Sequence, residues 1–144
     1  MPLKHDSRLV LVVDDEPGVC WSLSMLLGAH GFDVVTMLNG EAALGWLRVH
    51  GAKCGLVLID AKLPDIEGFD LAARIRGETR CTAPLIMVSG YFYDDDRLVQ
   101  DALHSGLIAA FLTKPFKHVE MLKTVNALLS RGGGATPREP APGR

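Results

Sequence analysis

The stretch LVLIDAKLPDIEGFDL, residues 56–71, decides the fold class. It opens on four consecutive apolar residues, which is typical of a strand buried on both faces of a parallel sheet. The apolar run stops at Asp60, and after Gly68 the side chains of Leu71 and Ile75 recur at helical spacing. A buried strand, a polar loop and an amphipathic helix together predict one βα unit of a parallel sheet.

The same unit recurs along the rest of the chain. Short apolar runs lie on both sides of this stretch, and helical periodicity follows each of them. The predicted strands are residues 9–13, 34–37, 56–59, 85–88 and 109–112. The predicted helices begin at Pro17, after Gly40, after Gly68, near residue 95 and near residue 118, and the last two end near residues 104 and 130. Because right-handed crossovers place helices on both faces of such a sheet, we expect an α/β fold with a doubly wound, five-stranded parallel sheet and five helices.

Length and composition are consistent with one compact domain, since the chain has 144 residues and 48% of them are hydrophobic. Its longest apolar runs, such as residues 107–112, are far shorter than the roughly 20 residues that cross a bilayer. No apolar signal-peptide stretch follows the N-terminus, and the three cysteines form neither a disulfide framework nor a metal-binding pattern. We therefore expect a cytoplasmic protein that does not bind membranes. The formal charge of −2, without a basic stripe, argues against direct nucleic-acid binding.

The two ends of the chain differ from its centre. Residues 132–144 contain the run GGG and three prolines but no apolar periodicity, which indicates a disordered tail or linker. We expect residues 1–7 to be an N-terminal segment and residues 8–131 to be the folded domain.

Polar residues follow four of the five predicted strands. Asp14 and Asp15 follow the first strand, and Asp60 follows the third. Ser89 and Lys114 follow the fourth and the fifth. In a parallel sheet these strand ends share one edge, where ligands bind. Because three carboxylates repel one another, we expect a cation among them, either Lys114 or a hard divalent metal such as Mg²⁺.

This set of residues fits phosphoryl transfer. A metal and an ammonium group neutralise the transferring oxygens while a carboxylate attacks, and Asp60 is the expected nucleophile. The Ser89 hydroxyl and the Gly90 backbone amide are expected to bind the phosphoryl oxygens.

Four stretches resemble the motif blocks of the receiver domains of bacterial two-component response regulators, which are also called CheY-like. They occur in the family's order and at nearly its spacings, each at the end of a predicted strand, and the resemblance covers residues 8–130. The four stretches are LVLVVDDEP at 9–17, LVLIDAKLPDIEGFDL at 56–71, LIMVSG at 85–90 and FLTKPF at 111–116. The resemblance implies a flavodoxin-like sheet with the strand order 2-1-3-4-5.

It also implies a magnesium-dependent phosphoacceptor site. Asp60 would accept a phosphoryl group from a sensor histidine kinase, a phosphotransfer protein or a small phosphodonor. Asp15, Asp60 and the backbone carbonyl of Lys62 would bind Mg²⁺ directly, and Asp14 would act mostly through water. Catalysis would be limited to self-phosphorylation and self-dephosphorylation. Lys114 would pair with the phosphoryl group.

Other roles implied by the resemblance concern the backbone and the response to phosphorylation. The backbone amides of Ala61 and Gly90 would bind the phosphoryl group, and the peptide bond between Lys114 and Pro115 would be cis. Ser89 and Phe111 would form the switch. Their movement would change the surface of the fourth helix, fifth strand and fifth helix, through which a downstream output partner, an output domain or a second copy of the chain would bind.

The sequence departs from the family pattern at three points. Phe111 lacks the hydroxyl of the more common tyrosine, so readout through that hydroxyl is not expected. The stretch 89–106 is about two residues longer than usual, and 106–114 about one residue longer. Both changes flank the fourth helix, whose register is therefore the least transferable part of the resemblance.

Each assignment has a simpler structural alternative. Asp14 and Asp15 could cap the first helix, Lys114 could be a surface lysine, and Ser89 with Gly90 could be an ordinary turn. Two other functions are alternatives for the whole chain. One is a receiver-like interaction module that works without phosphorylation, and the other is a phosphatase of the haloacid-dehalogenase type. Trp21 and Trp46 are interpreted as packing residues.

Overall fold

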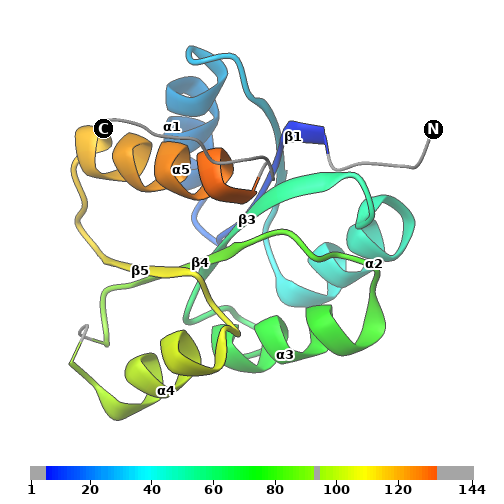
Figure 1. Cartoon of the computed structure of the whole chain (residues 1–144), viewed down its shortest axis with the longest axis vertical. Helices are drawn as coiled ribbons and strands as arrows, with labels where there is room; N and C mark the ends of the chain where they lie inside the picture. Colours follow the sequence, from blue (N-terminus) through cyan, green and yellow to red (C-terminus); the bar gives the residue numbers. More distant parts are fainter. Residues whose placement is uncertain (1–5, 93–94, 133–144) are drawn as a thin grey trace.

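In the computed structural model, which describes residues 6–92 and 95–132, the chain forms a five-stranded sheet with five helices. All neighbouring strands run parallel, in the order β2-β1-β3-β4-β5 (Figure 1). The strands are β1 (Asp6–Val13), β2 (Asp33–Met37), β3 (Cys54–Asp60), β4 (Leu85–Ser89) and β5 (Ala110–Thr113). The helices are α1 (Pro17–Gly28), α2 (Gly40–His50), α3 (Gly68–Glu78), α4 (Arg97–Ser105) and α5 (His118–Gly132). The predicted doubly wound sheet and its strand order are thus confirmed.

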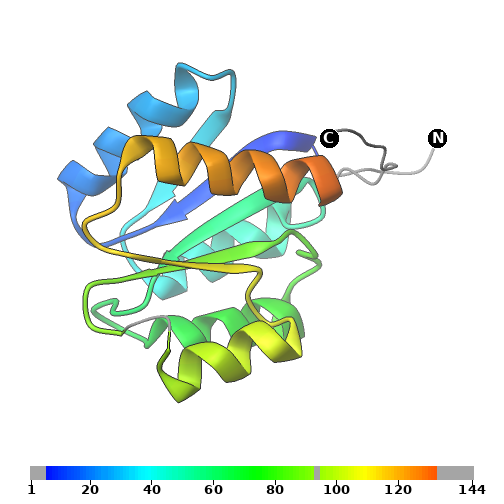
Figure 2. The ribbon, with the colours of Figure 1, turned by 60° about the vertical axis from the view of Figure 1, so that its left-hand side comes forward.

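The helices cover both faces of the sheet. Helices α1 and α5 lie on one face, and α2, α3 and α4 lie on the other (Figures 1 and 2). Each face has its own hydrophobic core, represented by Leu27 and Val125 under α1 and α5 and by Leu44, Leu71 and Val99 under the other three helices. This division explains why the strand sequences are apolar at successive positions, since alternate side chains enter different cores.

The central strand, β3, is the longest strand that is buried along its whole length. Every residue of β3 is buried, and the four apolar residues at 56–59 are at most 2% exposed. Full burial of each such side chain contributes about 1.5–3 kcal/mol. The strand therefore holds Asp60, its last residue, on a rigid support.

Several boundaries differ from the sequence expectation. Strand β1 begins at Asp6 rather than at residue 9, because Asp6 pairs with Cys54 before an irregularity in the ladder. Helix α4 begins at Arg97, two residues after the expected start. Trp21 was expected to pack, but 67% of its surface is exposed, because α1 turns that side chain away from the sheet. The expected tail falls almost entirely on residues 133–144, which lie outside the described residues, as do residues 1–5.

Within residues 6–92 and 95–132, no helix combines the length and the apolar character needed to cross a membrane.

Candidate functional site

Three carboxylates meet at the carboxyl edge of the sheet. One oxygen of each of Asp14, Asp15 and Asp60 lies within 4.8 Å of the others. The sheet register causes this meeting, since β1 and β3 are neighbours and pair Val13 with Ile59 immediately before the acidic residues. Asp14 and Asp60 are only 3% and 8% exposed, whereas Asp15 faces solvent. The sequence prediction that these residues converge is confirmed.

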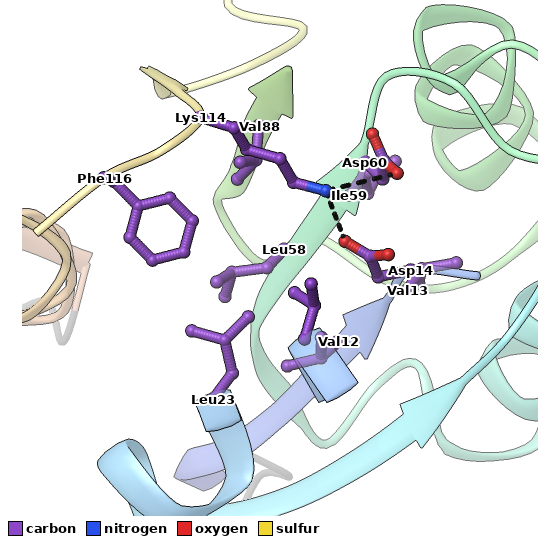
Figure 3. Close-up of a pocket in the computed structure, with 11 residues that line it drawn as sticks. Val12, Val13, Asp14, Leu23, Leu58, Ile59, Asp60, Val88, Lys114 and Phe116 are labelled. Carbon is purple, nitrogen blue, oxygen red and sulfur yellow. Dashed lines mark hydrogen bonds and ion pairs between the residues drawn. The ribbon is translucent and has the colours of Figure 1, made fainter. Parts of the chain in front are cut away.

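The side chain of Lys114 reaches into this acidic cluster. Its Nζ lies 2.9 Å from Asp14 Oδ2 and 3.5 Å from Asp60 Oδ2 (Figure 3). The lysine backbone is fixed as well, because its N–H donates to the Ser89 carbonyl (2.8 Å) and its peptide bond to Pro115 is cis, as expected. Burial acts to lower the pKa of Lys114, but the carboxylates of Asp14 and Asp60 outweigh it and raise the pKa. The ammonium group is therefore firmly charged.

The Asp60 carboxyl has a pKa above its ordinary value. Burial is the largest cause, and the negative charge of Asp14 acts in the same direction. The Lys62 N–H, 3.3 Å from Asp60 Oδ1, and the Lys114 ammonium oppose this shift only in part. More positive charge beside Asp60 would therefore stabilise its ionised form.

An open cleft of about 490 Å³ adjoins the carboxylates. It gives a ligand a route to Asp60 from solvent. Its lining residues are Asp15, Glu16, Asp60, Lys62, Gly90, Tyr91 and Lys114.

Two of the expected phosphoryl-binding groups have other partners in this structure. The Ser89 hydroxyl oxygen accepts hydrogen bonds from the Tyr91 and Phe92 amides, at 2.9 and 3.0 Å, so it caps the loop that follows β4. The Ala61 amide donates to the Val88 carbonyl (2.8 Å) and extends the ladder between β3 and β4. In this geometry the Ala61 N–H does not face the cleft, which corrects the expectation for it.

Sequence reasoning missed two groups that the structure brings to the site. The amide that faces the Asp60 carboxylate is that of Lys62, as its hydrogen bond shows. The Glu16 carboxylate lies 3.5 Å from Lys114 Nζ and lines the cleft. Its position directly after the two aspartates was the available signal.

Phe111, the expected switch residue, is half-buried on β5. It packs against the core on the α2, α3 and α4 side of the sheet, where Phe92 also lies. Phe92 in turn makes an edge-on contact with Phe69 of α3, with ring centroids 5.5 Å apart. The loop after Ser89 is thereby tied to the same core as Phe111.

The loop that follows Asp60 also supports helix α2. The two oxygens of Asp65 accept hydrogen bonds from the Gly40 and Glu41 amides, each at 2.9 Å, and so bind free N–H groups at the start of that helix. Burial acts to raise the pKa of Asp65, but these hydrogen bonds outweigh it and lower the pKa.

Asp65→Ala should therefore destabilise the protein by about 0.5–1 kcal/mol at pH 7, as expected for an exposed capping group. The folded-state pKa is lowered, so this contribution is present above the unfolded pKa and disappears as the pH falls through the folded pKa. Urea unfolding of wild type and variant at pH 7 and below pH 3 measures both effects. An equal difference at both pH values would contradict the charge-dependent part of this explanation.

The chain is similar to known proteins in both sequence and structure. The sequence model of the response regulator receiver domain matches residues 10–126. The chain is 33% identical to the sensory transduction protein RegX3 of Mycobacterium tuberculosis over 124 residues, covering 86% of this chain and 52% of the relative. It is 34% identical to the transcriptional regulatory protein KdpE of the same species over 131 residues, covering 91% and 55%.

The chain thus spans about half the length of these curated relatives. Among solved structures, a CheY-like receiver domain protein from Methanospirillum hungatei superposes with a TM-score of 0.77 at 24% identity, covering 92% of this chain and 98% of that one. The chain belongs to the response regulator receiver domain family of two-component signalling.

Proposed function

We propose that this chain is a phosphorylation-dependent switch that accepts a phosphoryl group on Asp60 in the presence of Mg²⁺. One observation carries the proposal: the Asp60 carboxylate lies at an open cleft within 3.5 Å of the Lys114 ammonium and beside two further carboxylates. Folding alone gives no reason to gather three acidic groups at one place, because they repel one another.

The donor set suits a hard divalent cation. Carboxylate oxygens are the ligands that Mg²⁺ prefers, and oxygens from three carboxylates lie within 4.8 Å of one another. Asp15, Asp60 and the Lys62 carbonyl would hold the ion directly, and Asp14 would hold it mostly through water. When bound, Mg²⁺ neutralises negative charge on the carboxylates and on the phosphoryl oxygens.

The residues of the chain then have separate tasks in the transfer. An Asp60 carboxylate oxygen attacks phosphorus and forms an acyl phosphate, while the bond to the donor breaks and the donor leaves with its electron pair. The Lys114 ammonium pairs with the phosphoryl oxygens. The amides of Lys62 and Gly90 donate to the same oxygens, so Lys62 takes the role first expected of Ala61.

The switch begins at Ser89. To donate its hydroxyl to a phosphoryl group, Ser89 would turn away from the Tyr91 and Phe92 amides, which would then release the loop after β4. Phe111 would follow by packing inward, and the surface of α4, β5 and α5 would change. An output partner, an output domain or a second copy of the chain would bind that altered surface.

A sensor histidine kinase or a phosphotransfer protein would supply the phosphoryl group in the cytoplasm. Residues 8–131 would act as the receiver unit, and residues 132–144 would act as a tail or linker to whatever the chain regulates.

Mapping the modified residue tests the proposal. Incubation with acetyl phosphate and Mg²⁺, followed by reduction with borohydride, should convert one aspartate to homoserine within tryptic peptide 54–62. That peptide contains one acidic side chain, Asp60. Omission of Mg²⁺ in the presence of EDTA is the control, and it should prevent the conversion. Modification of another peptide would overturn the choice of Asp60, and an unmodified protein would favour the phosphorylation-independent interaction module.

A further inference from the structure

Two buried thiols contact each other far from the acidic cluster. Cys54 begins β3 and Cys81 lies between α3 and β4, and they are 0% and 2% exposed. Their side chains lie next to each other inside the core beneath α2, α3 and α4, and Cys54 Sγ donates to the Leu56 carbonyl (3.3 Å). Because β3 runs from Cys54 to Asp60, the two thiols lie at the opposite edge of the sheet, about 20 Å from the phosphoacceptor.

The surrounding backbone holds the two cysteines close together. Cys54 N–H donates to the Gly51 carbonyl (3.2 Å), and a Cβ built on Gly51 would lie 3.1 Å from Cys81 N and 3.3 Å from Cys81 Cβ. Both cysteines precede the first hydrogen bonds between β3 and β4, where Val57 N–H donates to the Pro84 carbonyl (3.1 Å). Both cysteines thus lie just before the point where β3 and β4 become neighbours, and both contact Gly51.

The two thiols differ in their chemical environment. The Arg76 guanidinium donates to the Cys81 carbonyl (3.0 Å) and to the Ala83 carbonyl (2.7 Å), so positive charge lies beside Cys81. The neighbouring Cys54 thiol and this positive charge lower the pKa of Cys81, whereas the neighbouring Cys81 thiol and burial raise the pKa of Cys54. The Arg76 guanidinium beside Cys81 favours the thiolate of that residue, and the thiolate is the reactive form.

Cys81 also has more solvent-exposed neighbours in the chain than Cys54 does. Cys81 lies in residues 79–84, which contain neither helix nor strand, and its neighbours Arg80 and Thr82 are both exposed. Cys54 is part of the central strand. A small opening of the connection between α3 and β4 would expose Cys81 first.

We propose that Cys54 and Cys81 form a reversible disulfide by exchange with a small-molecule disulfide such as oxidised glutathione. The Cys81 thiolate attacks one sulfur of that molecule, which releases one thiol and leaves a mixed disulfide on Cys81. Cys54 then loses its proton and attacks the Cys81 sulfur, which releases the second thiol. In the net reaction, two protein thiols are oxidised to one disulfide, and one small-molecule disulfide is reduced to two thiols.

Oxidation of the native protein with oxidised glutathione at neutral pH tests the proposal. The intact mass should fall by two hydrogen atoms, and digestion should yield tryptic peptides 54–62 and 81–97 joined to each other. Cys20 should remain available for alkylation after unfolding. The cross-link ties β3 to the start of β4, so it should also raise the Tm by roughly 5–10 °C.

Two variants define the order of the steps. Cys54→Ala should stop at a glutathione adduct on Cys81, and Cys20→Ala, the matched control, should form the disulfide like wild type. The cross-link is measured in the wild-type protein, so a variant that folds poorly leaves the test intact. Native protein whose Cys54 and Cys81 stay reduced, or which forms the cross-link only in urea, would overturn the proposal.

Discussion

Asp60→Asn should reduce phosphoryl uptake from acetyl phosphate below detection, a loss of at least about a thousandfold. The amide oxygen is a poor nucleophile, and the substitution also removes one of the three carboxylates that would hold Mg²⁺. Intact-mass measurement of the phosphorylated fraction over time provides the comparison with wild type. Uptake that survives the substitution at a comparable rate would show that another residue is the acceptor.

The variant should lose this chemistry without losing its fold. Burial and the charge of Asp14 raise the pKa of Asp60, so an ionised carboxylate at this position lowers the stability of the metal-free protein. The neutral amide should therefore leave metal-free protein at least as stable as wild type in urea unfolding. Asp65→Ala is the matched control on the same loop, because it should lower stability while leaving the rate of uptake within about twofold of wild type.

Much of the fold was predictable because it depends on burial that the sequence displays directly. The run at 56–59 has no polar position, and a strand of that composition has to be covered on both faces. Strand starts were less predictable. Asp6 joins β1 through backbone pairing with Cys54, and backbone pairing leaves no pattern in the side chains.

The candidate site was also predictable only in part. Asp14, Asp60 and Lys114 could be placed together from their positions at strand ends, because the sheet determines where those ends lie. The orientation of amides and hydroxyls could not be predicted in this way. Whether the Ala61 or the Lys62 amide faces the carboxylate depends on a single turn of the backbone, which the sequence does not specify.

Gly68 shows how closely the loop after Asp60 is packed. It is the first residue of α3, and its N–H donates to the Ala61 carbonyl (2.7 Å). A Cβ at this position would lie 2.6 Å from Ala61 Cα, 2.6 Å from the Asp60 carbonyl oxygen and 2.9 Å from Met87 Sδ. Two of these atoms belong to the backbone, so they cannot move aside by rotation of a side chain. The helix approaches the phosphoacceptor strand at a distance that only glycine permits.

Gly68→Ala should therefore destabilise the protein by about 3 kcal/mol, at the upper end for overpacking, and lower the Tm by roughly 10 °C. Below that temperature phosphoryl uptake should be about tenfold slower or worse, since the new methyl group pushes on the backbone that positions Asp60. Thermal unfolding and uptake from acetyl phosphate at a low temperature measure the two effects separately.

Gly77→Ala, near the end of the same helix, is the matched control. A Cβ there meets no atom within 4 Å, so the substitution should stabilise the protein by about 0.5–1 kcal/mol through helix propensity alone. If both substitutions gave the same small gain, α3 could shift away from β3 at little cost, and the close packing at Gly68 would not be what positions Asp60. A loss of stability for Gly68→Ala together with a gain for Gly77→Ala would instead show that the contact between Gly68 and β3 holds α3 in place.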